Sequence, residues 1–138
     1  TEDREAHREE RDNDLIKRLA YRAEDLRSYF RKWIELEAKE LDIDFSLLIP
    51  QCNEPQIRSG LEMKQKRVKQ IAFTELAEHL KFLEEAAESL KNGATDDLVK
   101  DMWQLEDGIN YLRGLVRELR DIRAFVDSIL DRDRAEPG

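Results

Sequence analysis

The sequence predicts an all-α protein, and more specifically an antiparallel bundle of three long helices. Charged residues make up 41% of its 138 residues, while five glycines and three prolines leave few places where the chain can turn. Such a composition is typical of long helices and coiled coils. Apolar residues also recur every three to four positions over long stretches, which places them on one face of an α-helix. Long amphipathic helices joined by short turns pack as antiparallel neighbours.

A first helix is expected from about residue 13 to residue 41, because apolar residues recur there at helical spacing. These residues are Leu15, Leu19, Ala23, Leu26, Phe30 and Trp33. We expect Leu26, Phe30 and Trp33 to lie in the core. Residues 1–13 are predicted to form a charged extension, helical or disordered. The bundle domain is expected to span 14–131, followed by a disordered tail at 132–138.

Residues 41–55 do not follow the helical period. They contain Pro50 and Pro55 and are too apolar for a free loop. The apolar side chains are Ile43, Phe45, Leu47, Leu48 and Ile49. We therefore expect a non-helical connection that packs over one end of the bundle.

A second helix is predicted after this connection. Pro55 suits its first turn, and Ser59 with Glu62 matches a capping box. Its inward residues are Leu61, Val68, Ala72, Leu76, Leu80, Leu83, Ala87 and Leu90. Asn92 and Gly93 are expected to end it, because glycine readily adopts the left-handed conformation that closes many helices.

The third helix is expected to begin after Thr95, which can cap it, with Asp96 and Asp97 favourable in the first turn. Its inward seam has the four-three spacing of a heptad repeat. The seam consists of Leu98, Met102, Leu105, Ile109, Leu112, Val116 and Leu119. Gly108 and Gly114 each cost a helix about 1 kcal/mol relative to alanine, which suggests a close approach by another backbone.

The net charge of −8 excludes a general attraction to nucleic acid or anionic lipid. The single cysteine, Cys52, cannot form an internal disulfide and fits a reducing, cytoplasmic location. No apolar run approaches the roughly 18 residues of a membrane span, and the N-terminus is too charged for a signal peptide. His7 and His79 have no second ligand at metal-binding spacing, so we expect neither a metal nor another cofactor.

The stretch "EEAAE" raises the question of a metal site. Glu84, Glu85 and Glu88 resemble the first half of the carboxylate motif of the all-helical nucleotide pyrophosphohydrolases of the MazG kind. The resemblance implies that these carboxylates, with Asp107 of the next helix, hold Mg²⁺ against a nucleotide's phosphates. Gln104 stands where that motif has a carboxylate, and the helical phase turns most of these acids away from the seams. A magnesium-dependent nucleotide pyrophosphohydrolase is therefore the alternative to a non-enzymatic protein.

Two stretches resemble a spectrin-type repeat: "YFRKWIELEAKEL" (29–41) and "ELAEHLKFLEEAAESLKNG" (75–93). The heptad seam after "ATDDL" is similar to the third helix of such a repeat, although Ile109 stands where that helix carries a tryptophan. Spectrin-like repeats are structural spacers and docking surfaces without catalysis. The resemblance therefore implies a non-enzymatic interaction or scaffolding module, with tandem neighbouring repeats or self-association.

Basic residues indicate one end of the bundle as a partner-binding surface. If the second and third helices are antiparallel about the turn at 93–94, the numbers of facing residues sum to about 187. This register brings together Lys64, Lys66, Arg67 and Lys69 with Arg113, Arg117, Arg120 and Arg123. Such an end would dock an acidic or phosphorylated protein segment, as in a regulatory bundle, unless Glu35, Glu37 and Glu40 of the first helix neutralise it. Trp103 points away from the seam and is expected to be an exposed contact residue.

Overall fold

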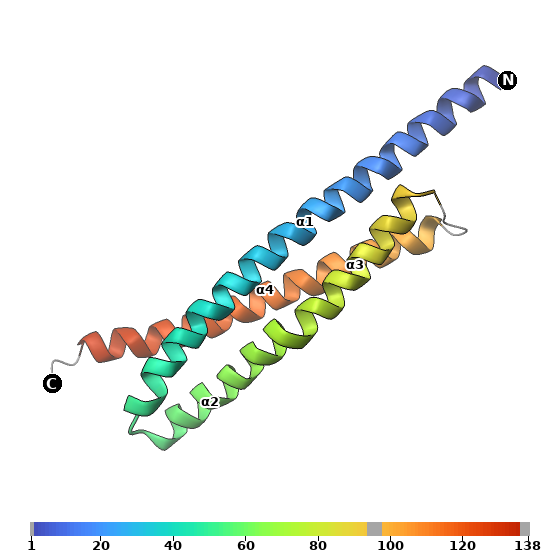
Figure 1. Cartoon of the computed structure of the whole chain (residues 1–138). Coiled ribbons are helices and arrows are strands. Elements are labelled where there is room, and N and C mark those ends of the chain that lie inside the picture. Colours follow the sequence, from blue (N-terminus) through green and yellow to red (C-terminus); the bar gives the residue numbers. More distant parts are fainter. Residues whose placement is uncertain (1, 94–97, 136–138) are drawn as a thin grey trace.

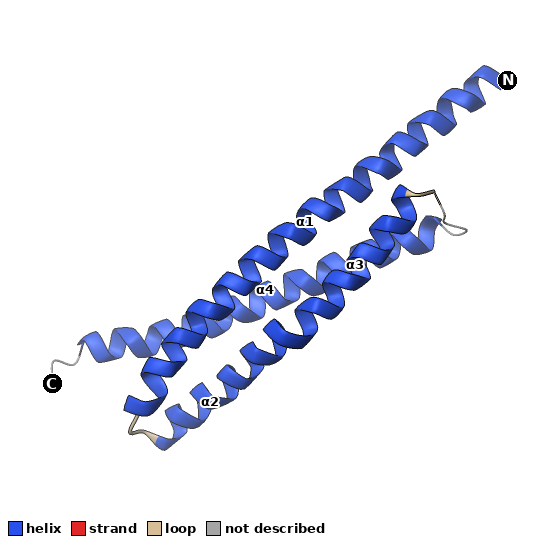
Figure 2. Ribbon diagram, viewed as in Figure 1, coloured by secondary structure: helices blue, strands red, loops and turns tan. Residues whose placement is uncertain are grey.

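The computed structural model describes residues 2–93 and 98–135, and every regular element in them is a helix (Figures 1 and 2). The chain forms α1 (Glu2–Gln51), α2 (Pro55–Gln70), the π-helix η1 (Ile71–Glu75), α3 (Leu76–Lys91) and α4 (Leu98–Ala135). The predicted all-α class is confirmed for the described residues. Four α-helices are present instead of three, because η1 divides the expected second helix without an intervening loop.

Successive parts of the chain reverse direction. In Figure 1, α1 runs from the upper right to the lower left, α2, η1 and α3 return beside it, and α4 runs back again. Arg67 on α2 hydrogen-bonds to Glu118 on α4. The side-chain amide of Gln104 on α4 donates to the carbonyl of Phe82 on α3. Both pairs of residue numbers sum to within two of 187, as expected for an antiparallel register. The N-terminal part of α1 extends beyond the other helices (Figure 1).

The prediction of a non-helical connection at 41–55 is wrong. α1 continues to Gln51, and only residues 52–54 separate it from α2. The buried residues of this segment are Leu41, Phe45 and Leu48. Their four-three spacing continues the inward face of α1, so the core stabilises the helix here. Pro50 has no N–H to donate to the carbonyl four residues earlier, but it lies one residue before the end of α1, so any distortion is confined to the last turn.

The π-helix η1 accommodates one extra residue in the spacing of the inward face. Val68 and Leu76 are eight residues apart, whereas one heptad spans seven. After this interval the four-three spacing resumes with the buried residues Leu80, Leu83, Ala87 and Leu90. A single π-turn adds one residue to the helix and so keeps both halves facing the core. Phe73, in the middle of η1, is left exposed.

The buried face of α4 is rotated from the predicted seam. Its buried positions are Leu105, Gly108, Leu112, Leu115, Leu119, Ile122 and Val126. Ile109 and Val116 are only half-buried, and Leu98 and Met102 are exposed. Gly108 lies on this buried face and packs against α3. A Cβ atom added to Gly108 would lie 3.5 Å from a Cδ of Leu83, which is an ordinary van der Waals distance.

Two further predictions about the core and the caps need correction. Phe30 is buried as expected, whereas Leu26 and Trp33 pack only partly against the core. Ser59 does not cap a helix, because α2 begins four residues earlier at Pro55 and has no side-chain cap.

The ends of the helices agree in part with the sequence. α3 ends at Lys91, and Gly93 follows with the predicted left-handed conformation at φ 63°. The expected cap of Thr95, Asp96 and Asp97 lies outside the described residues. The charged extension is helical from Glu2 onwards, and α4 remains helical at 132–135, where a disordered tail was expected.

Candidate partner-docking site

An open apolar groove lies between α1 and the first half of α4, with a volume of about 650 Å³. Its lining consists of Leu19, Arg22, Ala23 and Leu26 from α1 and Val99, Met102, Trp103, Leu105, Glu106, Ile109, Asn110 and Arg113 from α4. Trp103 has 66% of its surface exposed, which confirms the exposure predicted from its helical phase. The groove exists because the rotation of α4 turns its first apolar residues towards the gap instead of the core. A large apolar groove with an exposed tryptophan is typical of a surface that binds a protein partner.

Two arginines stand in this groove, one from each helix. Neither Arg22 nor Arg113 forms an ion pair with any residue in the described parts of the chain. Among the described residues of the lining, Glu106 is the one acid. The groove is therefore slightly basic in a chain that is acidic overall, and acidic groups on a partner would be attracted to it.

α1 also carries a second apolar seam beside its buried face, which we call the outer seam. It consists of Leu15, Leu19, Arg22, Leu26, Tyr29, Trp33, Leu36, Glu40, Ile43 and Leu47. These ten positions keep an unbroken four-three spacing, as in a coiled coil. Leu26 and Trp33 are half-buried, and the other six apolar members keep between 39% and 61% of their surface exposed. Only Arg22 and Glu40 of these ten residues are charged, so the outer seam has the apolar character and the spacing of a helix-packing surface.

Two arginines of the predicted basic end are paired with acids inside the molecule. The first is Arg67. Its Nη2 donates to Oε2 of Glu118 at 2.8 Å, and its Nη1 donates to Oε1 of Glu75 at 2.8 Å. The side-chain hydrogen bond to Glu118 is the main reason why the pKa of Arg67 is raised, and the same bond lowers the pKa of Glu118. Arg67 therefore joins α2, η1 and α4, and its charge is already balanced.

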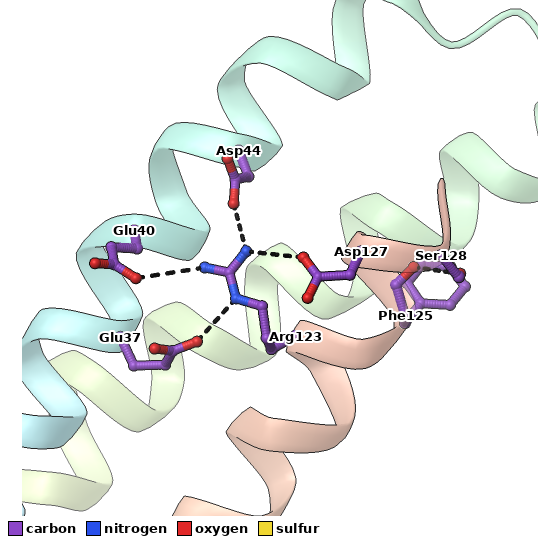
Figure 3. A network of polar contacts seen from close by, with 7 residues as sticks. All are labelled: Glu37, Glu40, Asp44, Arg123, Phe125, Asp127 and Ser128. Carbon is purple, nitrogen blue, oxygen red and sulfur yellow. Dashed lines mark hydrogen bonds and ion pairs between the residues drawn. The ribbon is translucent and has the colours of Figure 1, made fainter. Parts of the chain in front are cut away.

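Arg123 has four carboxylates around it (Figure 3). Its Nη1 donates to Asp44 at 2.5 Å and its Nε donates to Glu37 at 2.9 Å. Asp127 lies 3.5 Å and Glu40 3.9 Å from the guanidinium. Burial acts to lower the pKa of Arg123, but the hydrogen bonds to Asp44 and Glu37 outweigh it and raise that pKa. Four acids around one base leave this cluster with an excess of negative charge.

The other predicted basic residues divide between aromatic contacts and solvent. Lys64 lies 4.8 Å from the ring centroid of Phe125, and Arg120 lies 5.6 Å from that of Trp33. Both distances fit cation–π contacts. The exposed members of the whole predicted set are Lys66, Lys69, Arg113, Arg117 and Arg120. Only part of the predicted basic surface is therefore open to a partner.

The acids of the alternative metal site do not converge. Glu84, Glu85, Glu88 and Asp107 are all exposed, as their helical phase predicts. Glu84 forms an ion pair with Arg27 of α1 at 3.0 Å. Across residues 2–93 and 98–135, no three His, Cys, Asp or Glu side chains gather closely enough to hold a metal ion.

The remaining candidate residues take part in packing. His79 stacks on Tyr111 with 3.5 Å between the ring centroids. Cys52 is half-buried and is the first residue of the connection between α1 and α2. Within the described ranges, none of the helices combines the length and the apolar character that a bilayer crossing requires.

No protein-family model matches this chain, and no curated protein or solved structure is significantly similar to it. Its site is therefore interpreted from geometry alone. The groove and the outer seam escaped the sequence reasoning, although the unbroken spacing from Leu15 to Leu47 was a signal that could have revealed the seam.

Proposed function

We propose that this chain is a non-enzymatic helical interaction module that receives a partner helix in the groove between α1 and α4. The observation that carries the proposal is the continuity of the groove with the outer seam, because Leu19, Arg22 and Leu26 belong to both. A long apolar strip with heptad spacing suits an amphipathic helix laid along it. The exposed Trp103 provides a large contact residue at one end of that strip.

The charges of the groove define the kind of partner helix. Arg22 and Arg113 lie on opposite walls and have no ion-pair partner among the described residues. An amphipathic helix with acidic residues beside its apolar face would complement both walls. Such charges mainly favour correct orientation and fast association. The acidic partner expected from the sequence is thus assigned to this groove, in place of the end where Arg67 and Arg123 are balanced internally.

The architecture supports a scaffolding role. If α2, η1 and α3 are counted as one interrupted rod, the chain has three long antiparallel rods, which is the arrangement expected for a spectrin-like repeat. The half-buried thiol of Cys52 fits a reducing compartment such as the cytoplasm. The outward directions of Glu84, Glu85 and Asp107 favour this role over nucleotide hydrolysis.

A photo-crosslinking amino acid tests whether the groove is a docking site. We would place p-benzoylphenylalanine at position 103 of the chain expressed in its native cells. Met63 serves as the control position, because it is similarly exposed and does not belong to the lining of this groove. Position 103 should crosslink to an amphipathic helix, identified by mass spectrometry, and the crosslink should disappear when Leu19→Asp is added to the groove wall. Equal yields at both positions, or a crosslink indifferent to Leu19→Asp, would rule out the groove as the docking site.

A further inference from the structure

The outer seam is long enough to bind a whole helix. It extends from Leu15 to Leu47, which is about 48 Å at a rise of about 1.5 Å per residue. Its first third forms one wall of the groove. A helix laid along the seam would therefore also enter the groove and approach Trp103.

We propose that the occupant is α1 of a second copy of this chain, packed antiparallel along the outer seam. The proposal rests on the proposed function, because it names the partner of the same site. In an antiparallel coiled coil, the numbers of facing seam residues have a constant sum. A sum of 62 pairs Leu15 with Leu47, Leu19 with Ile43, Arg22 with Glu40, Leu26 with Leu36, and Tyr29 with Trp33 of the partner subunit. Every seam position then has a counterpart, and the two-fold axis passes near residue 31.

The two charged positions of the seam select this register. At a sum of 62, Arg22 faces Glu40 of the partner subunit twice, once on each side of the axis. A shift by one heptad would place Arg22 against Trp33 or Leu47 of the partner subunit, and would leave Glu40 against apolar side chains. A parallel, in-register pair would place Arg22 against Arg22 and Glu40 against Glu40. Like charges and unpaired buried charges are both costly in an interface.

The surroundings of these two residues support the pairing. Arg22 has no ion-pair partner within the described parts of its own chain, whereas Glu40 belongs to the acid-rich cluster around Arg123 (Figure 3). Glu40 is the most distant of the four carboxylates, at 3.9 Å, and more than half of its side chain is exposed. An arginine from a second copy would therefore supply a missing positive charge. Arg123 would keep three acids close to it.

Charged residues that flank the seam form two attractive pairs and one repulsive pair between the two copies of α1. Asp25 approaches Lys39 of the partner subunit on each side of the axis, whereas Lys32 approaches Lys32 of the partner subunit near the axis. Asp25, Lys32 and Lys39 are all exposed in the single chain. The two attractive pairs outnumber the single like-charge pair, so the flanks also favour the antiparallel dimer.

Charge reversal combined with sedimentation velocity tests this dimer. The unmodified chain should sediment as a dimer at micromolar concentration. Arg22→Glu alone and Glu40→Arg alone should each raise the dissociation constant on the order of 100-fold, because each change turns two attractions into two repulsions. An equimolar mixture of these two single variants should restore a heterodimer, since opposite charges then face each other again. Lys17→Glu and Glu35→Arg are matched controls on exposed positions outside the seam and should leave the dimer unchanged.

Each alternative outcome has a defined meaning. A monomer at all concentrations, or a dimer that is insensitive to the charge reversals, would overturn the proposal. If the mixture does not restore association although both variants keep their helical spectra, the antiparallel register in which facing residue numbers sum to 62 is excluded. If the crosslink from position 103 maps to a helix of another protein while the chain stays monomeric, the groove is still a docking site. The proposal that a second copy of this chain occupies it is then wrong.

Discussion

Replacing Arg123 with methionine should destabilise the folded chain more than substitutions of other partly exposed residues usually do. Methionine retains most of the aliphatic volume but lacks the guanidinium that holds Asp44, Glu37, Asp127 and Glu40 together. The variant loses two short charge-assisted hydrogen bonds, to Asp44 at 2.5 Å and to Glu37 at 2.9 Å. It also leaves four carboxylates beside one another without a cation.

The expected loss follows from these contacts. Hydrogen bonds to charged groups contribute about 1.5–3 kcal/mol each, and solvent screening reduces this where the groups are partly exposed. We therefore expect Arg123→Met to lower the free energy of unfolding by about 2 kcal/mol. Urea denaturation followed by far-UV circular dichroism measures this directly, at concentrations low enough to keep the chain monomeric.

Two comparisons make this prediction specific. Arg113→Met removes an exposed arginine without a described partner, so it should change stability by less than about 0.5 kcal/mol. Adding Glu37→Gln and Asp44→Asn to Arg123→Met should recover part of the loss, because fewer negative charges then remain unpaired. If Arg123→Met costs no more than Arg113→Met, the cluster does not contribute to stability and the reasoning fails.

Three further predictions concern single residues. Because Arg67 lowers the pKa of Glu118, the stability from this pair is present above the ordinary pKa of about 4.5 and lost as pH falls through the lowered value; Glu118→Gln should flatten this acid dependence of the urea midpoint, and an unchanged slope would contradict it. Gly114 lies at an exposed position within α4, so Gly114→Ala should raise the free energy of unfolding by up to about 1 kcal/mol in the same assay. Gly93→Ala should lower the free energy of unfolding, because alanine is strained at the φ of 63° that Gly93 adopts. Equal effects of the two substitutions would refute this prediction. Phe45→Ala should cost about 3–5 kcal/mol and Leu47→Ala less than about 0.5 kcal/mol in the monomer; similar losses would mean that α1 does not continue as a helix.

Much of the second half of the fold follows from the sequence. Pro55 begins α2 and Gly93 follows the end of α3 because their backbone preferences are local and strong. The exposure of Trp103 followed from helical phase alone. The outward directions of Glu85 and Asp107 followed in the same way. These predictions succeeded because each depended on one helix and its own period.

The sequence of residues 41–51 wrongly predicts a non-helical connection because two seams overlap in this segment. Phe45 and Leu48 belong to the buried face of α1, whereas Ile43 and Leu47 belong to the outer seam. Together they form an apolar run without a visible period, which looks like a packed connection. The same mixture explains why Leu15 and Leu19 share the helical spacing that predicts the first helix although both are exposed.

Long-range features could not be predicted from one helix at a time. The eight-residue interval between Val68 and Leu76 signals an extra residue, but only packing on both sides decides that a π-turn absorbs it. The rotation of α4 depends on how this helix packs against the other helices, and the apolar side chains that the rotation leaves outside the core line the groove. Likewise, the sequence placed Arg123 at the correct end but could not show that four acids surround it.

Pulsed electron paramagnetic resonance on spin-labelled α1 tests most directly that this chain assembles through its outer seam. Ser28 and Ser46 are both exposed and lie five full turns apart on one side of α1, so each can carry a label in a Cys52→Ser background. In the antiparallel dimer the two labels at position 28 should be separated by only about 9 Å along the helix axes, and those at position 46 by about 45 Å. A short distance at both positions would indicate a parallel pair, and the absence of any intermolecular distance at micromolar concentration would show that the outer seam does not bind a second copy.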